Sequence, residues 1–86
     1  MTEAEINIII GRRIRLRRRD SDMTMRDLGL KCGVSFQQVQ KHEVGAAALT
    51  VPRLVAFAHV LNTRPESFLE GLTEADLGWT PKQARA

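Results

Sequence analysis

The sequence is poor in the features of secreted and membrane proteins. It has one cysteine, Cys32, no tyrosine, and no apolar run that approaches the roughly 20 residues of a membrane span. One cysteine cannot form an internal disulfide, so we expect a reducing, cytoplasmic setting and a core position for Cys32. Acidic residues precede the apolar stretch at 6–10, which is unlike a signal peptide. These absences favour a soluble intracellular protein with no membrane partner.

The sequence also lacks the side-chain groupings of catalysis and cofactor binding. It contains no paired nucleophile and base, no metal-ligand spacing and no phosphate-binding loop. Neither His42 nor His59 has a second ligand at useful spacing, and we expect His42 to be partly buried and hydrogen-bonded. From 86 residues we expect one small domain, without a second domain to hold a small-molecule effector. We therefore expect neither an enzyme nor a metal, cofactor or effector site.

Positive charge is concentrated in the first half of the chain. Residues 1–45 hold nine Lys and Arg against six Asp and Glu, whereas residues 46–86 hold four of each. Six arginines lie between Arg12 and Arg19, a density compatible with phosphate contacts. The alternative is that Arg12, Arg15 and Arg19 line a solvated helix face.

Residues 25–44 predict two short helices that meet at a tight turn. Thr24 and Asp27 have the spacing of a capping box, which starts the first helix, and we expect it to run to Cys32. Gly33 can adopt the left-handed conformation that ends a helix. The second helix must therefore begin within a few residues of Gly33.

Ser35 is a natural N-cap for this second helix, which should start at Phe36. Ser35 and Gln38 also have capping-box spacing, with the Gln38 side chain returning to the Ser35 amide. At about 100° per residue the helix has two faces, one of them formed by Val39, His42 and Glu43. The other carries amides, a cation and an aromatic ring, from Phe36, Gln37, Gln40 and Lys41. Side chains of this kind suit the major groove of DNA.

The remaining segments predict three more helices. An isoleucine stripe at 6, 10 and 14 predicts a helix from about Glu5 to Arg19, with residues 1–5 frayed. Thr50 is a plausible N-cap for a helix with apolar positions at 54, 57, 58 and 61, closed by Asn62. Residues 44–49 should form a loop between the helix that begins at Phe36 and the helix that Thr50 caps.

The last predicted helix runs from Pro65 to Glu70 and buries Phe68 and Leu69. Its start rests on a capping signature at residues 63 and 66. We find no strand-like alternation, so the fold should be all-α. We expect residues 1–72 to form the domain and residues 73–86 to form a C-terminal extension that is partly disordered and available for dimerisation.

These residues resemble the helix-turn-helix family of Cro and the phage repressors, also called the xenobiotic-response-element type. The small, turn and apolar residues of that motif fall at Leu28, Gly29, Cys32, Gly33, Val34 and Val39. The flanking GRRIRLRR, EVG and VPRLVAFAHVL resemble the family's neighbouring helices, so that the resemblance covers residues 10–72. It implies a five-helix phage-repressor-like DNA-binding domain. The implied function is a sequence-specific transcriptional regulator, a repressor that binds a two-half-site operator as a homodimer with the third helix in the major groove.

The resemblance also implies roles for individual residues. Family members read base edges from positions that correspond here to Phe36, Gln37 and Lys41. Phe36 either meets a thymine methyl or packs over the preceding helix. Contacts to the DNA backbone, or support for them, are expected from Arg18, Thr24, Met25, Gln38, Gln40, Ala46 and Arg53. Arg18 and Glu43 match a buried ion pair that locks the first helix to the third.

Three features of the sequence depart from the family pattern. Met25 stands where a glutamine commonly holds a phosphate, and residues 46–48 are alanines that offer backbone amides but no polar side chains. Arg17 replaces a leucine, and its stem is expected to cover the core while its charge reaches water. The first two departures favour an alternative function, a partner-binding adaptor or antitoxin that keeps the fold.

The expected dimer interface lies at the C-terminal end of the domain. Relatives place this region beside the molecular twofold axis, and four large apolar side chains follow one another there: Leu69, Leu72, Leu77 and Trp79. In the alternative arrangement, Trp79 folds back over the first helix near Ile9. Ile8 and Ile9 lie off the isoleucine stripe and either meet the C-terminal segment or form a subunit contact.

Overall fold

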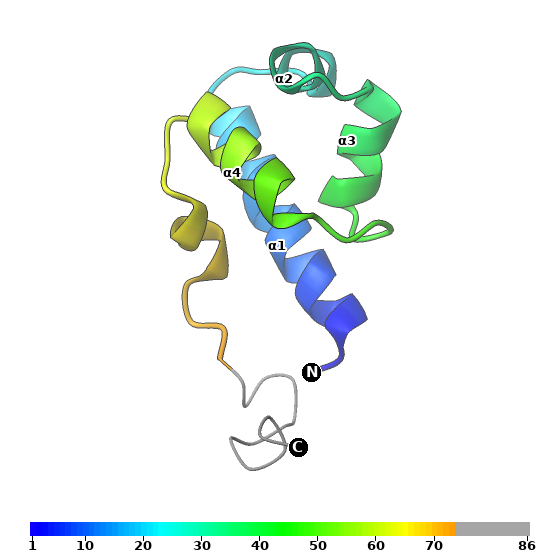
Figure 1. Cartoon of the computed structure of the whole chain (residues 1–86), viewed down its shortest axis with the longest axis vertical. Helices are drawn as coiled ribbons and strands as arrows, with labels where there is room; N and C mark the ends of the chain where they lie inside the picture. The colour runs from blue at the N-terminus through cyan, green and yellow to red at the C-terminus, as the bar shows by residue number, and fades with distance from the viewer. Residues whose placement is uncertain (74–86) are drawn as a thin grey trace.

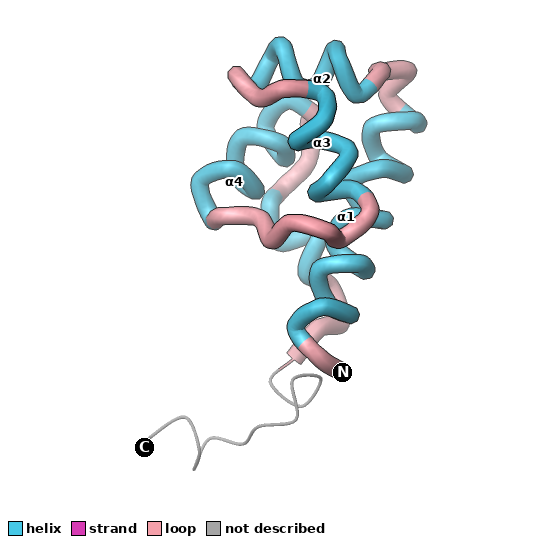
Figure 2. The backbone as a smooth tube through the Cα atoms, turned by 90° about the vertical axis from the view of Figure 1, so that its right-hand side faces the viewer, coloured by secondary structure: helices cyan, strands magenta, loops and turns pink. Residues whose placement is uncertain are grey.

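The computed structural model describes residues 1–73, and this part of the chain contains four α-helices and one short 3₁₀ helix. The helices are α1 (Glu3–Asp20), α2 (Met25–Cys32), α3 (Phe36–Glu43), α4 (Val51–Val60) and the 3₁₀ helix η1 (Pro65–Leu69). Figure 1 shows α1 and α4 in the middle, with α3 on one side and η1 on the other. Figure 2 shows the same helices from the side, with loops as the only other structure in the described part. The all-α prediction is confirmed, with a 3₁₀ helix in place of the fifth α-helix.

The start of α1 is ordered, so the predicted fraying of residues 1–5 is wrong. Thr2 accepts a hydrogen bond from the Glu5 amide through Oγ1, and Glu5 accepts one from the Thr2 amide, both at 3.1 Å. This capping box satisfies donors that the first turn would otherwise leave unpaired. The Thr2 amide and the Thr2 hydroxyl both donate to the Glu5 carboxylate, and because these bonds favour its charged form they hold the pKa of Glu5 below its usual value. At the other end, Asp22 has a left-handed φ of 56°, which ends the helix.

Helices α2 and α3 have the predicted bounds. Thr24 and Asp27 form the predicted reciprocal cap, with hydrogen bonds of 3.0 Å in both directions. Gly33 ends α2 in the left-handed conformation, with φ 70°. Gly29 lies so close to the Val34 carbonyl that a Cβ there would overlap it. Two glycines therefore set the angle between the helices.

The fifth segment differs most from its prediction. Its N-cap is Arg64, whose side chain makes no capping bond, and the Thr63 hydroxyl meets the Ser67 hydroxyl at 3.0 Å, so the predicted cap at 63 and 66 is wrong. Without a side-chain cap the segment closes as a single short 3₁₀ helix. Phe68 is buried as predicted, whereas Leu69 is 40% exposed.

One apolar core lies between the helices. Eight buried side chains form it: Ile14, Leu28, Val39, Leu54, Phe57, Ala58, Leu61 and Phe68. Cys32 packs against it half-buried, and burial raises the pKa of its thiol, in keeping with the predicted core position. Three polar residues are also buried, namely Arg18, His42 and Glu43. In the described residues no helix is long and apolar enough to cross a membrane.

Candidate nucleic-acid interface

Helix α3 has one buried and one exposed face, divided as the sequence predicts. Val39, His42 and Glu43 are between 0 and 4% exposed and face the core. The opposite face is open to solvent and carries Phe36, Gln37, Gln40 and Lys41. Because no core requires polar groups on this face, its amides and ammonium group are free to meet an external partner.

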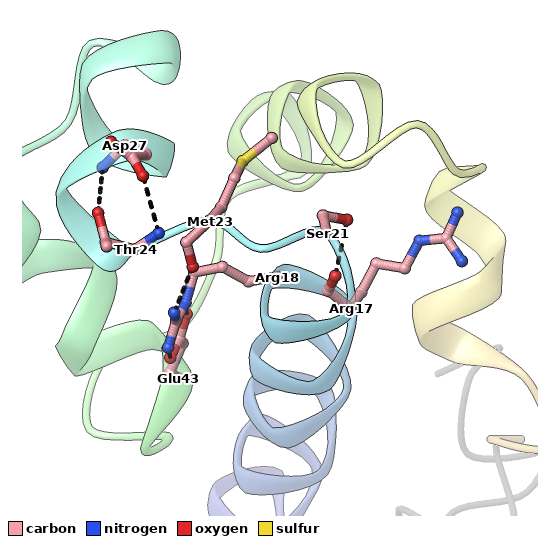
Figure 3. Close-up of polar contacts among 7 residues, drawn as sticks. All are labelled: Arg17, Arg18, Ser21, Met23, Thr24, Asp27 and Glu43. Atoms are coloured by element: carbon pink, nitrogen blue, oxygen red, sulfur yellow. Dashed lines mark hydrogen bonds and ion pairs between the residues drawn. The ribbon is translucent and has the colours of Figure 1, made fainter.

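The C-terminal end of α3 is fixed to α1 by a buried ion pair. Arg18 donates from Nε to Glu43 Oε2 at 2.6 Å and from its terminal nitrogen to Oε1 at 3.0 Å. It also donates to the Met23 carbonyl at 2.7 Å, so that one guanidinium holds α3 and the chain that enters α2 (Figure 3). Gly11 permits this approach, because a Cβ there would overlap the main-chain carbonyls of His42 and Glu43. No local pattern in the sequence indicates this close approach at Gly11.

His42 links α3 to the following loop and to α4. Its Nδ1 lies 3.1 Å from the Ala47 carbonyl, which can only accept, so Nδ1 carries the proton. Its Nε2 then accepts from Gln38 at 3.3 Å and from Arg53 at 3.4 Å. The predicted bond from the Gln38 side chain to the Ser35 amide is replaced by this contact, although Ser35 caps α3 as expected. The imidazole is 1% exposed, more deeply buried than predicted.

Phe36, the first residue of α3, packs against α2. The guanidinium carbon of Arg26 lies 5.3 Å from the centroid of the Phe36 ring, within the range of a cation–π contact. Phe36 nevertheless remains 40% exposed. The packing over α2 that was one alternative for this residue is therefore observed, and the thymine-methyl contact stays a prediction. The local sequence does not indicate this contact, because Arg26 and Phe36 lie ten positions apart on two different helices.

At two of the expected backbone-contacting positions, the Met25 side chain and the Ala46 amide contact the protein itself. Met25 is half-buried against the core. The Ala46 amide donates to the Lys41 carbonyl at 2.8 Å, and the Ala47 amide donates to the same carbonyl at 3.2 Å. These two amides serve the turn at Gly45, which has a φ of 79°, so the expectation that they are free for a partner is wrong.

The expected dimer residues are only partly within the described chain. Leu69 is 40% exposed, Leu72 is half-buried, and Leu77 and Trp79 lie outside the described residues. Leu69 borders an apolar hollow of about 220 Å³ that Ile10, Leu49 and Leu54 also line. Within residues 1–73 there is no group of three His, Cys, Asp or Glu side chains placed to hold a metal.

Comparisons with known proteins agree with this geometry. The family model described as helix-turn-helix matches residues 14–68. An uncharacterised HTH-type transcriptional regulator, y4aM of Sinorhizobium fredii, is 41% identical over 69 residues, which are 80% of this chain and 48% of the relative. A second, from Sinorhizobium medicae, is 37% identical over 81 residues, 94% of this chain and 58% of the relative. The chain thus spans about half the length of these relatives.

The fold also matches a solved structure. The clp gene regulator ClgR from Corynebacterium glutamicum superposes with a TM-score of 0.74 and 20% sequence identity, over 93% of this chain and 84% of that one. At this identity the match concerns the fold alone.

Proposed function

This chain belongs to the helix-turn-helix family of the Cro and C1 type, whose members are DNA-binding transcriptional regulators. From this premise we propose that α3 reads operator sequence in the major groove. The observation that carries the proposal is the exposed polar face of α3 on a helix whose other face is locked by the Arg18–Glu43 pair. A recognition helix needs both properties, because base-edge hydrogen bonds require side chains held in register with the groove.

Within this face, Gln37 and Lys41 are the base-reading residues. A glutamine amide can pair with adenine in two places, and a lysine can donate to guanine. Phe36 offers a smaller, apolar contact to a thymine methyl. Gln40 lies at the edge of the face and is assigned to a phosphate. Arg53 uses one nitrogen on His42, which leaves further guanidinium donors for a phosphate oxygen.

The protein acts as a repressor in the cytoplasm, binding two half-sites as a homodimer and blocking polymerase. One α3 reads only a few base pairs, so a second copy supplies the remaining specificity. The surface from Leu69 onward is the dimer interface, supported by the exposure of Leu69 beside an apolar hollow. Truncation after Gly71 should leave a folded monomer in sedimentation, with most operator affinity lost. A truncated protein that stays dimeric moves the interface elsewhere.

Binding to a selected duplex tests base reading. The wild-type protein is used to enrich an operator from a random-sequence pool, and affinities for the enriched and an unselected duplex are then compared. Gln37→Ala or Lys41→Ala should cost about 1 to 3 kcal/mol on the enriched duplex and little on the other. Gln40→Ala is the matched control on the same helix and should weaken both duplexes equally. Equal losses for Gln37→Ala on both would remove the base-reading assignment.

The alternative is a partner-binding protein that keeps this fold. The inward-facing Met25 and the occupied Ala46 and Ala47 amides favour it, because they remove expected contacts to the DNA backbone. Failure of the pool to enrich any duplex over several rounds would support this alternative over a DNA-binding repressor.

A further inference from the structure

Within residues 1–73, Arg26 differs from Arg13, Arg17 and Arg18 in the kind of partner that its guanidinium has. Arg18 has a carboxylate partner, and Arg13 and Arg17 donate to main-chain carbonyls. The Arg26 guanidinium contacts the Phe36 ring, and within residues 1–73 it makes no hydrogen bond or ion pair. The neighbouring carboxylate of Asp27 is occupied by the Thr24 amide.

The geometry of this contact leaves the guanidinium donors available. A cation–π contact uses the electrostatic field above the ring and consumes no N–H group. Within residues 1–73, the five N–H donors of the guanidinium therefore have no hydrogen-bond acceptor, although the group itself is restrained. An arginine restrained in this way loses less conformational freedom when it binds an anion than one that is free in solvent.

The position of Arg26 places these donors beside the proposed recognition helix. Arg26 lies in the first turn of α2, and Figure 1 shows α2 lying across the N-terminal end of α3. In the proposed binding mode that end of α3 enters the groove, so α2 lies over the groove's edge, where phosphates are found. Met25, the adjacent side chain, packs against the core and has no donor.

We propose that Arg26 binds a DNA phosphate and that Phe36 is the residue that positions its guanidinium. This inference rests on the proposed function and adds to it a backbone contact made by a side chain of α2. Arg26 supplies the anchor that Met25 lacks. Phe36 consequently has a role on every DNA sequence, in addition to any contact with a thymine methyl. A phosphate contact adds affinity without sequence preference, and each one contributes to the salt dependence of binding.

The test measures dissociation constants of the full chain against salt concentration, for the enriched duplex and for an unselected duplex of equal length. The variants are Arg26→Ala, Arg26→Lys, Phe36→Leu and the double variant Arg26→Ala with Phe36→Leu. Arg64→Ala is the matched control, because it removes the same charge from an exposed residue next to η1, on the far side of the molecule from α3. Thermal melting of each variant checks that the fold is intact.

Arg26→Ala should weaken binding to both duplexes by roughly tenfold, as expected for one charged hydrogen-bonded contact. The slope of log affinity against log salt should fall by about 0.9. Arg26→Lys should keep the slope and lose part of the affinity, because lysine keeps the charge without the planar stacked group. On the unselected duplex, Phe36→Leu should lower the binding affinity when Arg26 is present. It should have little further effect on this affinity once Arg26 is alanine. Arg64→Ala should change neither affinity nor slope by a comparable amount.

Three results would overturn the inference while the proposed function stands. In the first, wild type binds but Arg26→Ala behaves like Arg64→Ala. In the second, the Arg26→Ala loss is confined to the enriched duplex, which would make Arg26 a base-reading residue. In the third, Phe36→Leu costs the same factor on the unselected duplex with and without Arg26, which removes the positioning role. Absence of wild-type binding to either duplex would overturn the proposed function and this inference together.

Discussion

Arginines hold α1 to the rest of the molecule on two sides, and the two sides use different chemistry. Toward α3, the buried Arg18 forms an ion pair with Glu43, which is also buried, through two hydrogen bonds. Toward η1, Arg13 donates to the carbonyls of Phe68 and Glu70, and Arg17 donates to those of Leu61 and Asn62. Both of these arginines are more exposed than Arg18.

The difference lies in what remains when one partner is lost. On the α3 side, removal of Glu43 leaves the Arg18 charge buried without its carboxylate partner, so the cost in free energy of unfolding is large. On the η1 side, a carbonyl that loses an exposed arginine can bind water instead, so the cost is small. Helix α3 is therefore held to α1 more strongly than η1 is, and it carries the proposed base-reading face. The chain after η1 leads to the proposed dimer interface.

The largest expected effect comes from Glu43→Ala. The substitution leaves the Arg18 guanidinium buried and unpaired, which should cost about 3 to 5 kcal/mol of unfolding free energy. In a domain of this size each kcal/mol lowers Tm by roughly 4 to 8 °C, so thermal melting should show a fall of roughly 12 °C or more. The control is Glu66→Ala, at an exposed glutamate, which should stay within about 0.5 kcal/mol of wild type. Equal melting temperatures for wild type and Glu43→Ala would contradict the structural role of the pair.

The second effect comes from Gly11→Ala, which also acts on the α3 side. Alanine normally favours a helix by about 1 kcal/mol over glycine. Here the added methyl group would overlap the carbonyls of His42 and Glu43, which are main-chain atoms and cannot move without shifting α3. We expect a net loss of about 1 to 3 kcal/mol in urea unfolding. Arg12→Ala, at the next position and exposed, serves as the control. A stabilised Gly11→Ala protein would show that the helices can separate at no cost.

The third effect is smaller and lies on the η1 side. Arg17→Ala removes two donors from carbonyls at the end of α4, and the side chain is exposed, so the loss should be about 1 kcal/mol. Arg15→Ala removes an exposed arginine from the same helix and should have less effect. Urea unfolding of both variants measures the difference. An Arg17→Ala loss as large as that of Glu43→Ala would abolish the distinction between the two sides.

The sequence predicted best where the signals are local. The bounds of α2 and α3 follow from caps and a turn, each formed by residues at most five apart, such as Thr24 with Asp27 and the Gly33 turn. The Arg18–Glu43 pair was predicted by family resemblance, because a separation of 25 residues carries no local signal.

The contacts that the sequence did not predict are those that depend on side chains or helices already held in place by the fold. Arg17 was expected to cover the core and reach water, but its donors bind carbonyls 44 and 45 residues away. Gln38 was assigned to a local cap, but His42 offers it an acceptor that exists only once the imidazole is fixed by Ala47. The close approach at Gly11 likewise requires the two helices to be docked before it can be seen.

The smallest expected effect concerns acid and the cap of α2. Asp27 accepts hydrogen bonds from Thr24, and these hold the pKa of its carboxyl below the usual value. A carboxylate whose folded pKa is lower than its unfolded pKa contributes its full stabilisation above the unfolded value, and loses it as the pH falls through the folded value. Lowering the pH from 7 toward 3 is therefore expected to loosen the first turn of α2, whereas the η1-side carbonyls do not titrate. Glu5 caps α1 in the same way, so the readout must be local to α2.

Amide hydrogen exchange, expressed as protection factors, gives this local measurement. Protection in the first turn of α2 should fall in acid for wild type and change less for Asp27→Asn, which has no carboxylate to protonate. The stability difference between wild type and Arg17→Ala should stay constant over the same pH range, because a guanidinium and a carbonyl keep their charge states there. If the Asp27→Asn protein lost protection in α2 as steeply as wild type, the cap would not be the acid-sensitive contact. The acid sensitivity of the first turn of α2 would then have to arise from another group.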